Sequence, residues 1–174
     1  QKALRNLVLG LAVRDALRQD ALAGFDIVSF WEHVLRCGAA ARLLGEAAGL
    51  DADECFTAGL LADFGLLALF HLRPQQAEAW QALRSLDPEA RRDQERRRLG
   101  ASHDDVALAL SRAWALPAEL SAALTQHHDP GAWDEPPGLM QVLHCADWMA
   151  AVYAADDPAL VLERCRGCLA QHLG

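Results

Sequence analysis

Apolar residues return every three or four positions along the whole chain, and this spacing constrains the fold more than any other feature of the sequence. No run alternates β-branched with polar residues, and valine and isoleucine are few beside leucine and alanine. Proline, glycine and capping residues divide the pattern into about eight helices. The clearest helix starts are Ser29 with Glu32, Asp51 with Glu54, Asp87 with Pro88, Ser102, and Pro117. The clearest helix ends are Gly49, Pro74 and Gly100. The sequence therefore predicts an all-α, single-domain helical bundle over residues 1–174.

Composition and charge exclude several classes of protein. Just over half of the 174 residues are apolar, as in a packed globule, and 24 acidic residues against 16 basic ones give a net charge of −8. This balance argues against a nucleic-acid-binding protein, and we interpret the arginine-rich segment 91–100 as a solvated helix face. The longest apolar run is interrupted by Asp63 and is shorter than the roughly 20 residues of a membrane span. No signal peptide is visible, so we expect neither a nucleic acid nor a membrane as a partner.

The five cysteines indicate a reducing, cytoplasmic location. They are odd in number and mostly lie within apolar runs, unlike the cysteines of a disulfide framework. Cys165 and Cys168 form a CxxC pattern within a predicted helix, but the second ligand pair of a zinc site is missing. We therefore interpret these two residues as packed helix positions.

Several polar residues break the amphipathic pattern of the predicted helices. They are His33, Asp63, His103, His127, His128 and Asp147. A carboxylate in an apolar segment is costly unless it is paired or coordinated. Histidines and carboxylates from different helices of a bundle can hold Zn, Fe or Mn ions, which activate water for attack on phosphate esters.

Each of these residues also has a local explanation. His103 follows the Ser102 cap, and a His-His pair at a helix C-terminus is favoured by the helix dipole. His33 could form a buried ion pair with Asp63, and Asp147 could hydrogen-bond within its own helix. Singly, each residue is better explained in this way, and only their order along the chain favours a common site.

That order resembles the HDOD branch of the HD-domain superfamily of metal-dependent phosphohydrolases. The similar segments are FWEHVLRCGAAARLL, FTAGLLADFGLLAL, ERRRLGASHDDVALALSRAWALP, ALTQHHDP and VLHCADWMA. The resemblance covers roughly residues 4–153 and implies an all-α HD-like domain. The family domain usually has a further N-terminal helical segment, and Gln1 lies inside an apolar helical pattern. We therefore expect the chain to be a fragment of a longer protein.

The resemblance also implies a degenerate metal site. In catalytic relatives a first His, an adjacent His-Asp pair and a last Asp hold the metal, and the matching residues here are His33, Asp63 and Asp147. Ala62 stands where the pair has its histidine, and Leu66 stands where a lysine usually follows. The other matching histidines are His103, His127 and His128, which correspond to those that hold a second metal or contact substrate in HD-GYP relatives.

Without a metal, Asp63 and Asp147 would repel each other if they converge. We expect either that one of them is protonated or that His33 lies between them as an imidazolium. A weakly held divalent ion is the only cofactor that the remaining residues suggest.

Three functions are compatible with these features. The first, which we favour, is a non-catalytic bacterial signalling module that contacts other signalling proteins or domains. The second is a surviving phosphohydrolase or phosphodiesterase that acts on nucleotides or cyclic dinucleotides. The third is a pocket that senses a nucleotide or a metal without turnover. A proline-rich loop around Trp133 is either a contact surface or a packed cover.

Overall fold

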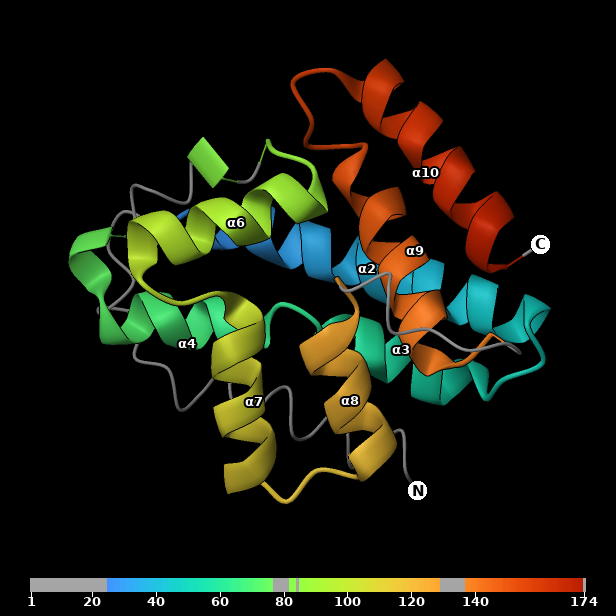
Figure 1. Ribbon diagram of the computed structural model, residues 1–174, viewed down its shortest axis with the longest axis horizontal. Coiled ribbons are helices and arrows are strands. Elements are labelled where there is room, and N and C mark those ends of the chain that lie inside the picture. The colour runs from blue at the N-terminus through green and yellow to red at the C-terminus, as the bar shows by residue number, and fades with distance from the viewer. Residues whose placement is uncertain (1–24, 77–81, 84, 129–136, 174) are drawn as a thin grey trace.

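The computed structural model describes residues 25–76, 82–83, 85–128 and 137–173, and all regular elements in these residues are helical (Figure 1). The elements are α2 (Ile27–Ala47), α3 (Ala52–Leu61), α4 (Phe64–Leu72), η2 (Pro74–Gln76), α6 (Pro88–Leu99), α7 (His103–Ala113), α8 (Ala118–Gln126), α9 (Leu139–Ala151) and α10 (Pro158–His172). The predicted all-α fold is confirmed. The helical patterns that the sequence shows over residues 4–17 and 75–86 lie outside the described residues, the first completely and the second by half, and so does the loop with Trp133.

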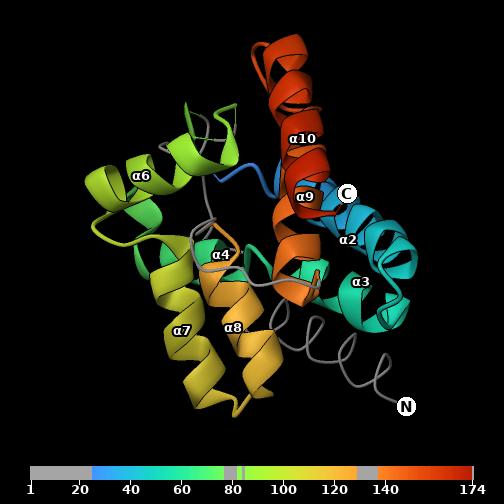
Figure 2. The same ribbon diagram turned by 45° about the vertical axis from the view of Figure 1, so that its right-hand side comes forward.

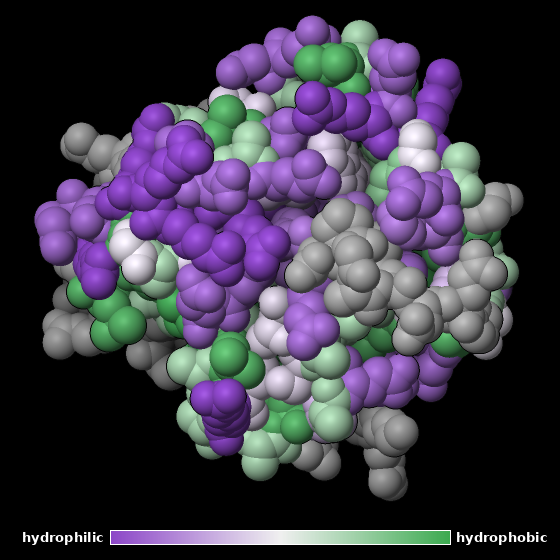
Figure 3. All heavy atoms as spheres, viewed as in Figure 1, coloured by the Kyte–Doolittle hydropathy of each residue, from purple (hydrophilic) through white to green (hydrophobic). Residues whose placement is uncertain are grey.

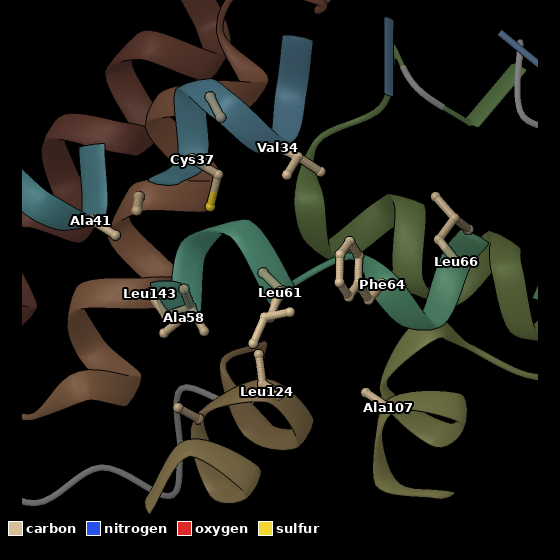
Figure 4. Close-up of a cluster of buried hydrophobic side chains, with 14 of the residues drawn as sticks. Val34, Cys37, Ala41, Ala58, Leu61, Phe64, Leu66, Ala107, Leu124 and Leu143 are labelled. Atoms are coloured by element: carbon tan, nitrogen blue, oxygen red, sulfur yellow. The ribbon is translucent and has the colours of Figure 1, made fainter. Parts of the chain in front are cut away.

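The long helix α2 carries the central stripe of the core. Phe30, Val34, Cys37 and Ala41 follow one another at helical spacing and are each no more than 1% exposed. They pack against side chains of α3, α4 and α9 in one continuous apolar cluster (Figure 4). This cluster is the scaffold that fixes the directions of the polar residues described below.

The start of α2 differs from the predicted capping box at Ser29. The helix begins three residues earlier because the Asp26 carboxylate accepts hydrogen bonds from the Ser29 N–H at 3.1 Å and from the Ser29 hydroxyl at 2.6 Å. Glu32 does not return to the helix start but accepts a hydrogen bond from Arg36 at 3.0 Å. The nearer carboxylate thus serves as the N-cap, and the spacing of Ser29 and Glu32 was misleading.

The apolar run 55–72, expected as one helix, is two helices. α3 ends at Leu61, a turn at Ala62 and Asp63 follows, and α4 begins at Phe64. The Asp63 side chain makes no capping hydrogen bond to α4. By length and composition the stretch Ala52–Leu72 could cross a membrane, but 72% of its most apolar window is buried inside the fold.

Two close approaches of the backbone fix how α3 and α4 pack. A Cβ atom on Gly59 would lie 2.7 Å from the Cα atom of Gly38, so α3 meets α2 where neither helix has a side chain. A Cβ atom on Gly65 would lie 2.0 Å from the carbonyl oxygen of His103, at the first turn of α7. These contacts hold the turn between α3 and α4 against α2 and α7.

The signals at the ends of α6 and α7 act as predicted. Asp87 accepts a hydrogen bond from the Ala90 N–H at 2.9 Å, and Gly100 ends α6 with a φ of +79°. Ser102 forms a capping box with Asp105 at the start of α7. The face seen in Figure 3 is hydrophilic over α6.

The interpretation of segment 91–100 as a solvated face is nevertheless wrong for two residues. Arg91 is 1% exposed and Glu95 is 0% exposed, and both lie on the inward side of α6 with Pro88 and Leu99. The middle of the inward stripe of α6 is therefore charged because it meets other charged groups, whereas Leu99 at its end joins the apolar core.

The helix α10 lies alongside α9 in both views (Figures 1 and 2). Its buried residues are Val161, Cys165 and Cys168, and they pack against α9 in a second, smaller cluster. This confirms Cys165 and Cys168 as packed helix positions. All five cysteines are buried and free, as the sequence indicated.

We expect Gly65→Ala to destabilise the protein by about 1–3 kcal/mol, because the new methyl group would overlap the backbone of α7. Gly167→Ala, in an exposed part of α10 where a Cβ meets no atom within 4 Å, is the matched control and should stabilise by about 0.5–1 kcal/mol. Urea unfolding of both variants measures the difference. Equal effects of the two substitutions would contradict the close α4–α7 packing.

Candidate functional site

The side chain of His33 connects the two buried aspartates. Its Nε2 atom lies 2.9 Å from Oδ2 of Asp63 and 3.0 Å from Oδ1 of Asp147. These atoms come from the middle of α2, from the α3–α4 turn and from α9. The convergence of Asp63 and Asp147, with His33 between them, is therefore as expected from the sequence.

The guanidinium group of Arg91 is a second cation at the same two carboxylates. Its Nη2 atom lies 3.1 Å from both carboxylate oxygens of Asp147 and 3.4 Å from Oδ1 of Asp63. Its Nε atom and Oε1 of Glu95 are 3.9 Å apart, an ion pair without a hydrogen bond. Arg91 thus supplies fixed positive charge where the sequence suggested only histidine.

The pKa values of this group follow from burial and from the opposite charges. Burial alone would raise the pKa of Asp63 and of Asp147, but Arg91 and His33 hold both well below the ordinary value. Burial lowers the pKa of His33, yet its hydrogen bonds to Asp147 and Asp63 raise it overall. Opposite charges also raise the pKa of Arg91, against the effect of burial. The group is therefore two carboxylates held by an imidazolium and a guanidinium.

A second cluster of imidazoles lies next to this group. Its possible ligand atoms lie within 4.8 Å of one another and belong to His103, Asp104, His127 and His128. Nδ1 of His103 is 2.6 Å from Oε2 of Glu95, and its Nε2 is 3.0 Å from Nε2 of His128. The two groups touch, since Nε2 of His103 is also 3.6 Å from Oδ1 of Asp63.

The histidines of this second cluster have opposite pKa shifts. Burial lowers the pKa of His103, but Glu95 and Asp104 raise it well above the ordinary value. Burial and the neighbouring cations lower the pKa of His128 well below its ordinary value, and burial also lowers that of His127. His103 is accordingly the charged donor, and His128 is the neutral acceptor of the hydrogen bond between them.

The possible ligand atoms of His33, Asp63 and Asp147 lie within 4.8 Å of one another, but here they are hydrogen-bonded to one another and to Arg91. The Nε2 atom of His33 must carry a proton to donate to two carboxylates, so it has no lone pair for an ion. Arg91 already contacts three of the four carboxylate oxygens, and Ala62 offers no ligand. The charge that a metal would supply is supplied by two side chains.

The second cluster fits better. Nε2 of His127 is buried and has no hydrogen-bond partner among the described residues, while its Nδ1–H donates to the Ala123 carbonyl at 3.1 Å. A carbonyl that fixes the ring in this way is the usual orienting contact of a metal-binding histidine. An ion here would require His103 to lose the proton that it shares with His128.

Ala62 and Leu66, the two positions where this sequence departs from the motif that it resembles, both belong to the apolar core. Ala62 is 2% exposed and Leu66 is 0% exposed. Figure 4 shows Leu66 on α4 among the core side chains. The position that would carry a phosphate-binding lysine is thus a packing position in this protein.

All six polar residues singled out in the sequence are brought together, but three partners were missed. These are Arg91, Glu95 and Asp104. Arg91 and Glu95 are four residues apart on one face of α6, a spacing typical of an ion pair, and Leu99 continues that face. That stripe was the sequence signal for a buried face of α6. The exposed arginines on the rest of the helix made the whole segment look like a solvated surface.

A family model described as HDOD domain matches residues 1–130. Among solved structures, a proposed phosphohydrolase of Shewanella amazonensis SB2B has a TM-score of 0.71 at 24% identity, covering 96% of this chain and 61% of that protein. The MmoQ response regulator of Methylococcus capsulatus str. Bath has a TM-score of 0.62 at 28% identity, with 85% and 59% covered. A proposed signal transduction protein of Marinobacter aquaeolei VT8 has a TM-score of 0.63 at 23% identity, with 95% and 42% covered. This chain therefore spans about three-fifths of the first two structures, and no curated protein sequence matches it.

We expect Arg91→Met to destabilise the protein by about 3–5 kcal/mol, because it leaves two buried carboxylates with one cation. The pKa values of Asp63 and Asp147 should rise toward the ordinary value. Their stabilising contribution, present above about pH 4 and lost as the pH falls through the folded-state pKa, should then be lost at higher pH. Urea unfolding over a pH series measures both effects.

Arg97→Met is the matched control, since Arg97 lies on the exposed side of the same helix. It should change the free energy of unfolding by less than about 0.5 kcal/mol. If Arg91→Met were as mild as this control, the guanidinium would not be the main cation of the site.

Proposed function

The chain belongs to the HDOD domain family, and we propose that within this family it is a non-catalytic bacterial signalling module that acts through protein contacts. The single observation that carries the proposal is the position of Arg91. Its guanidinium contacts both aspartates that would have to hold a metal.

Hydrolysis of a phosphate ester by a bound metal requires ligands that leave a position open for water or substrate. Here the acidic ligands are neutralised by Arg91 and His33, and the adjacent imidazole ligand is replaced by Ala62. The second cluster, around His127, is the place for a weakly bound divalent ion. Asp104 is the one carboxylate among its possible ligands, whereas Asp63 and Asp147, which would link it to a second ion, are paired with His33 and Arg91.

The similar structures support a signalling role in general terms. MmoQ, at 28% identity, is named as a response regulator. The Marinobacter protein is named as a proposed signal transduction protein, but at 23% identity it supports the fold alone. The Shewanella protein is named as a proposed phosphohydrolase, and at 24% identity it supports the fold alone. These organisms are bacteria, and five free thiols are in keeping with a cytoplasmic setting.

A role in protein contacts is supported by apolar side chains on the surface. Leu43 is 64% exposed and Tyr153 is 74% exposed, and both line a groove of about 480 Å³ between α2, α9 and α10. Arg36 lies over the Tyr153 ring at 5.0 Å and holds it at the edge of this groove. Exposed apolar groups gathered in one place are typical of an interaction surface.

With Mn²⁺ present, we expect the wild type to hydrolyse bis-p-nitrophenyl phosphate and cyclic dinucleotides no faster than the Asp63→Ala variant does. The Ala62→His/Arg91→Ala variant should bind one more Mn²⁺ ion per chain than the wild type, because it regains a ligand and loses the competing cation. Isothermal titration measures the uptake, and Mn²⁺ is chosen because it prefers carboxylate and imidazole to thiolate.

The control variant is Ala62→His/Arg97→Ala, which has the same ligand but keeps Arg91 between the carboxylates. It should bind no additional ion. Metal-dependent turnover by the wild type that Asp63→Ala abolishes would overturn the proposal.

A polar pocket favours a second candidate, the sensing of a phosphate-containing nucleotide without turnover. The pocket has a volume of about 220 Å³, and its lining includes Arg36 and Arg91 beside His33. Arg36 reaches this pocket from the exposed side of α2, where its partner is Glu32. Both arginines of the pocket already face carboxylates, Arg36 facing Glu32 and Arg91 facing Asp147, so an anion entering from solvent would compete with these.

If this candidate is correct, a nucleotide should raise the melting temperature of the wild type but not that of Arg36→Ala. The control is Arg42→Ala, since Arg42 lies on α2 away from the pocket and pairs with Asp53. Equal shifts in both variants would exclude the pocket as the binding site.

A further inference from the structure

A third cluster of potential metal ligands lies between α9 and α10. Its ligand atoms lie within 4.8 Å of one another and belong to His144, Cys168 and His172. His144 is on α9, and the other two residues are four positions apart on one face of α10. The cluster shares no residue with the two groups described above.

The ring of His144 is oriented by the backbone. Its Nδ1–H donates to the carbonyl oxygen of His127 at 2.6 Å, which places the lone pair of a neutral ring on Nε2. Burial lowers the pKa of His144 to about 4, so the ring is neutral near pH 7. A backbone carbonyl on one nitrogen of a neutral histidine is the contact that commonly prepares the other nitrogen for a metal.

The sulfur ligand is also held in place. Cys168 is 9% exposed, and its Sγ lies 3.2 Å from Sγ of Cys145 on α9. The hydrogen bond with Cys145, together with burial, raises the pKa of the Cys168 thiol. The side chain is therefore a protonated thiol before any ion binds.

We propose that His144, Cys168 and His172 bind a divalent ion of the zinc class, which fastens α10 to α9. One thiolate and two imidazoles form a ligand set that zinc prefers to the carboxylate-rich sets of Mg²⁺ or Mn²⁺. On binding, Cys168 releases its proton to solvent and forms the bond to the ion, and water completes the coordination.

The position of the cluster suits a structural ion. The described buried residues of α10 are few, namely Val161, Cys165 and Cys168, so this helix has little apolar surface holding it to the bundle. His172 is partly exposed and gives an ion access from solvent. Through the His127 carbonyl, the ion would also be one hydrogen bond away from the second cluster, to which His127 belongs.

Substitution of Co²⁺ into the intact chain tests the proposal, because a tetrahedral cobalt–thiolate site has a charge-transfer band in the near ultraviolet and intense visible bands. We expect one Co²⁺ per chain with these bands, displaced by Zn²⁺, and a melting temperature that Zn²⁺ raises and a chelator lowers. Cys168→Ser should remove the charge-transfer band. His172→Gln, at a partly exposed position where folding is not at risk, should weaken binding at least about tenfold.

Two controls separate this site from its neighbours. Cys165→Ser changes a buried thiol one turn earlier on the same helix and should leave the band intact. Asp63→Ala removes a carboxylate that contacts His33 and Arg91, and this variant should also keep the cobalt–thiolate band. Failure of the proposed signalling function would therefore not affect this result.

Three outcomes would overturn the proposal. These are a bound ion without a thiolate band, a band that survives both Cys168→Ser and His172→Gln, and a Cys145–Cys168 disulfide in the protein purified without reductant. The last would make the thiol pair a redox site instead of part of a metal site.

Discussion

The contact of Arg91 with Asp63 and Asp147 is the interaction on which the centre of this protein depends. Two carboxylates buried this close together repel each other unless positive charge compensates for them. A buried cation in turn needs excellent geometry to offset its desolvation. The structure meets both requirements with one guanidinium on α6 and one imidazolium on α2. Each of these two cations contacts both aspartates.

This arrangement explains several features of the backbone. The break between α3 and α4 places Asp63 in a turn, where its side chain is used by His33 and Arg91 instead of capping α4. The charged inward stripe of α6 has partners because the α3–α4 turn presents Asp63 to it, α9 presents Asp147 and α7 presents His103. Gly65 allows α7 to approach α4 closely, and His103 at the start of α7 lies 3.6 Å from the Asp63 carboxylate. The polar centre and the helix packing are thus determined together.

Most residues of the candidate site could be found from the sequence, but the contacts between their side chains could not. Histidines and aspartates stand out in apolar helices because burying them is costly, and their order singled out six residues that the structure places close together. Arg91 and Glu95 did not stand out, since arginine and glutamate are ordinary on exposed helices. The same ambiguity affected Ser29, whose spacing to Glu32 fits a capping box although Asp26 is the actual cap. Spacing along the chain could not show which of two nearby carboxylates, Asp26 or Glu32, is the partner of Ser29.

The sequence by itself determined the class of fold and the helix ends at Asp87, Gly100 and Ser102. These depend on periodicity, backbone preference and residue identity, which are local properties of the chain. Only the tertiary structure decided that Arg91 neutralises the aspartates and that His144, Cys168 and His172 converge between two helices. Both depend on which faces of distant helices meet, and that is set by the packing of the whole core.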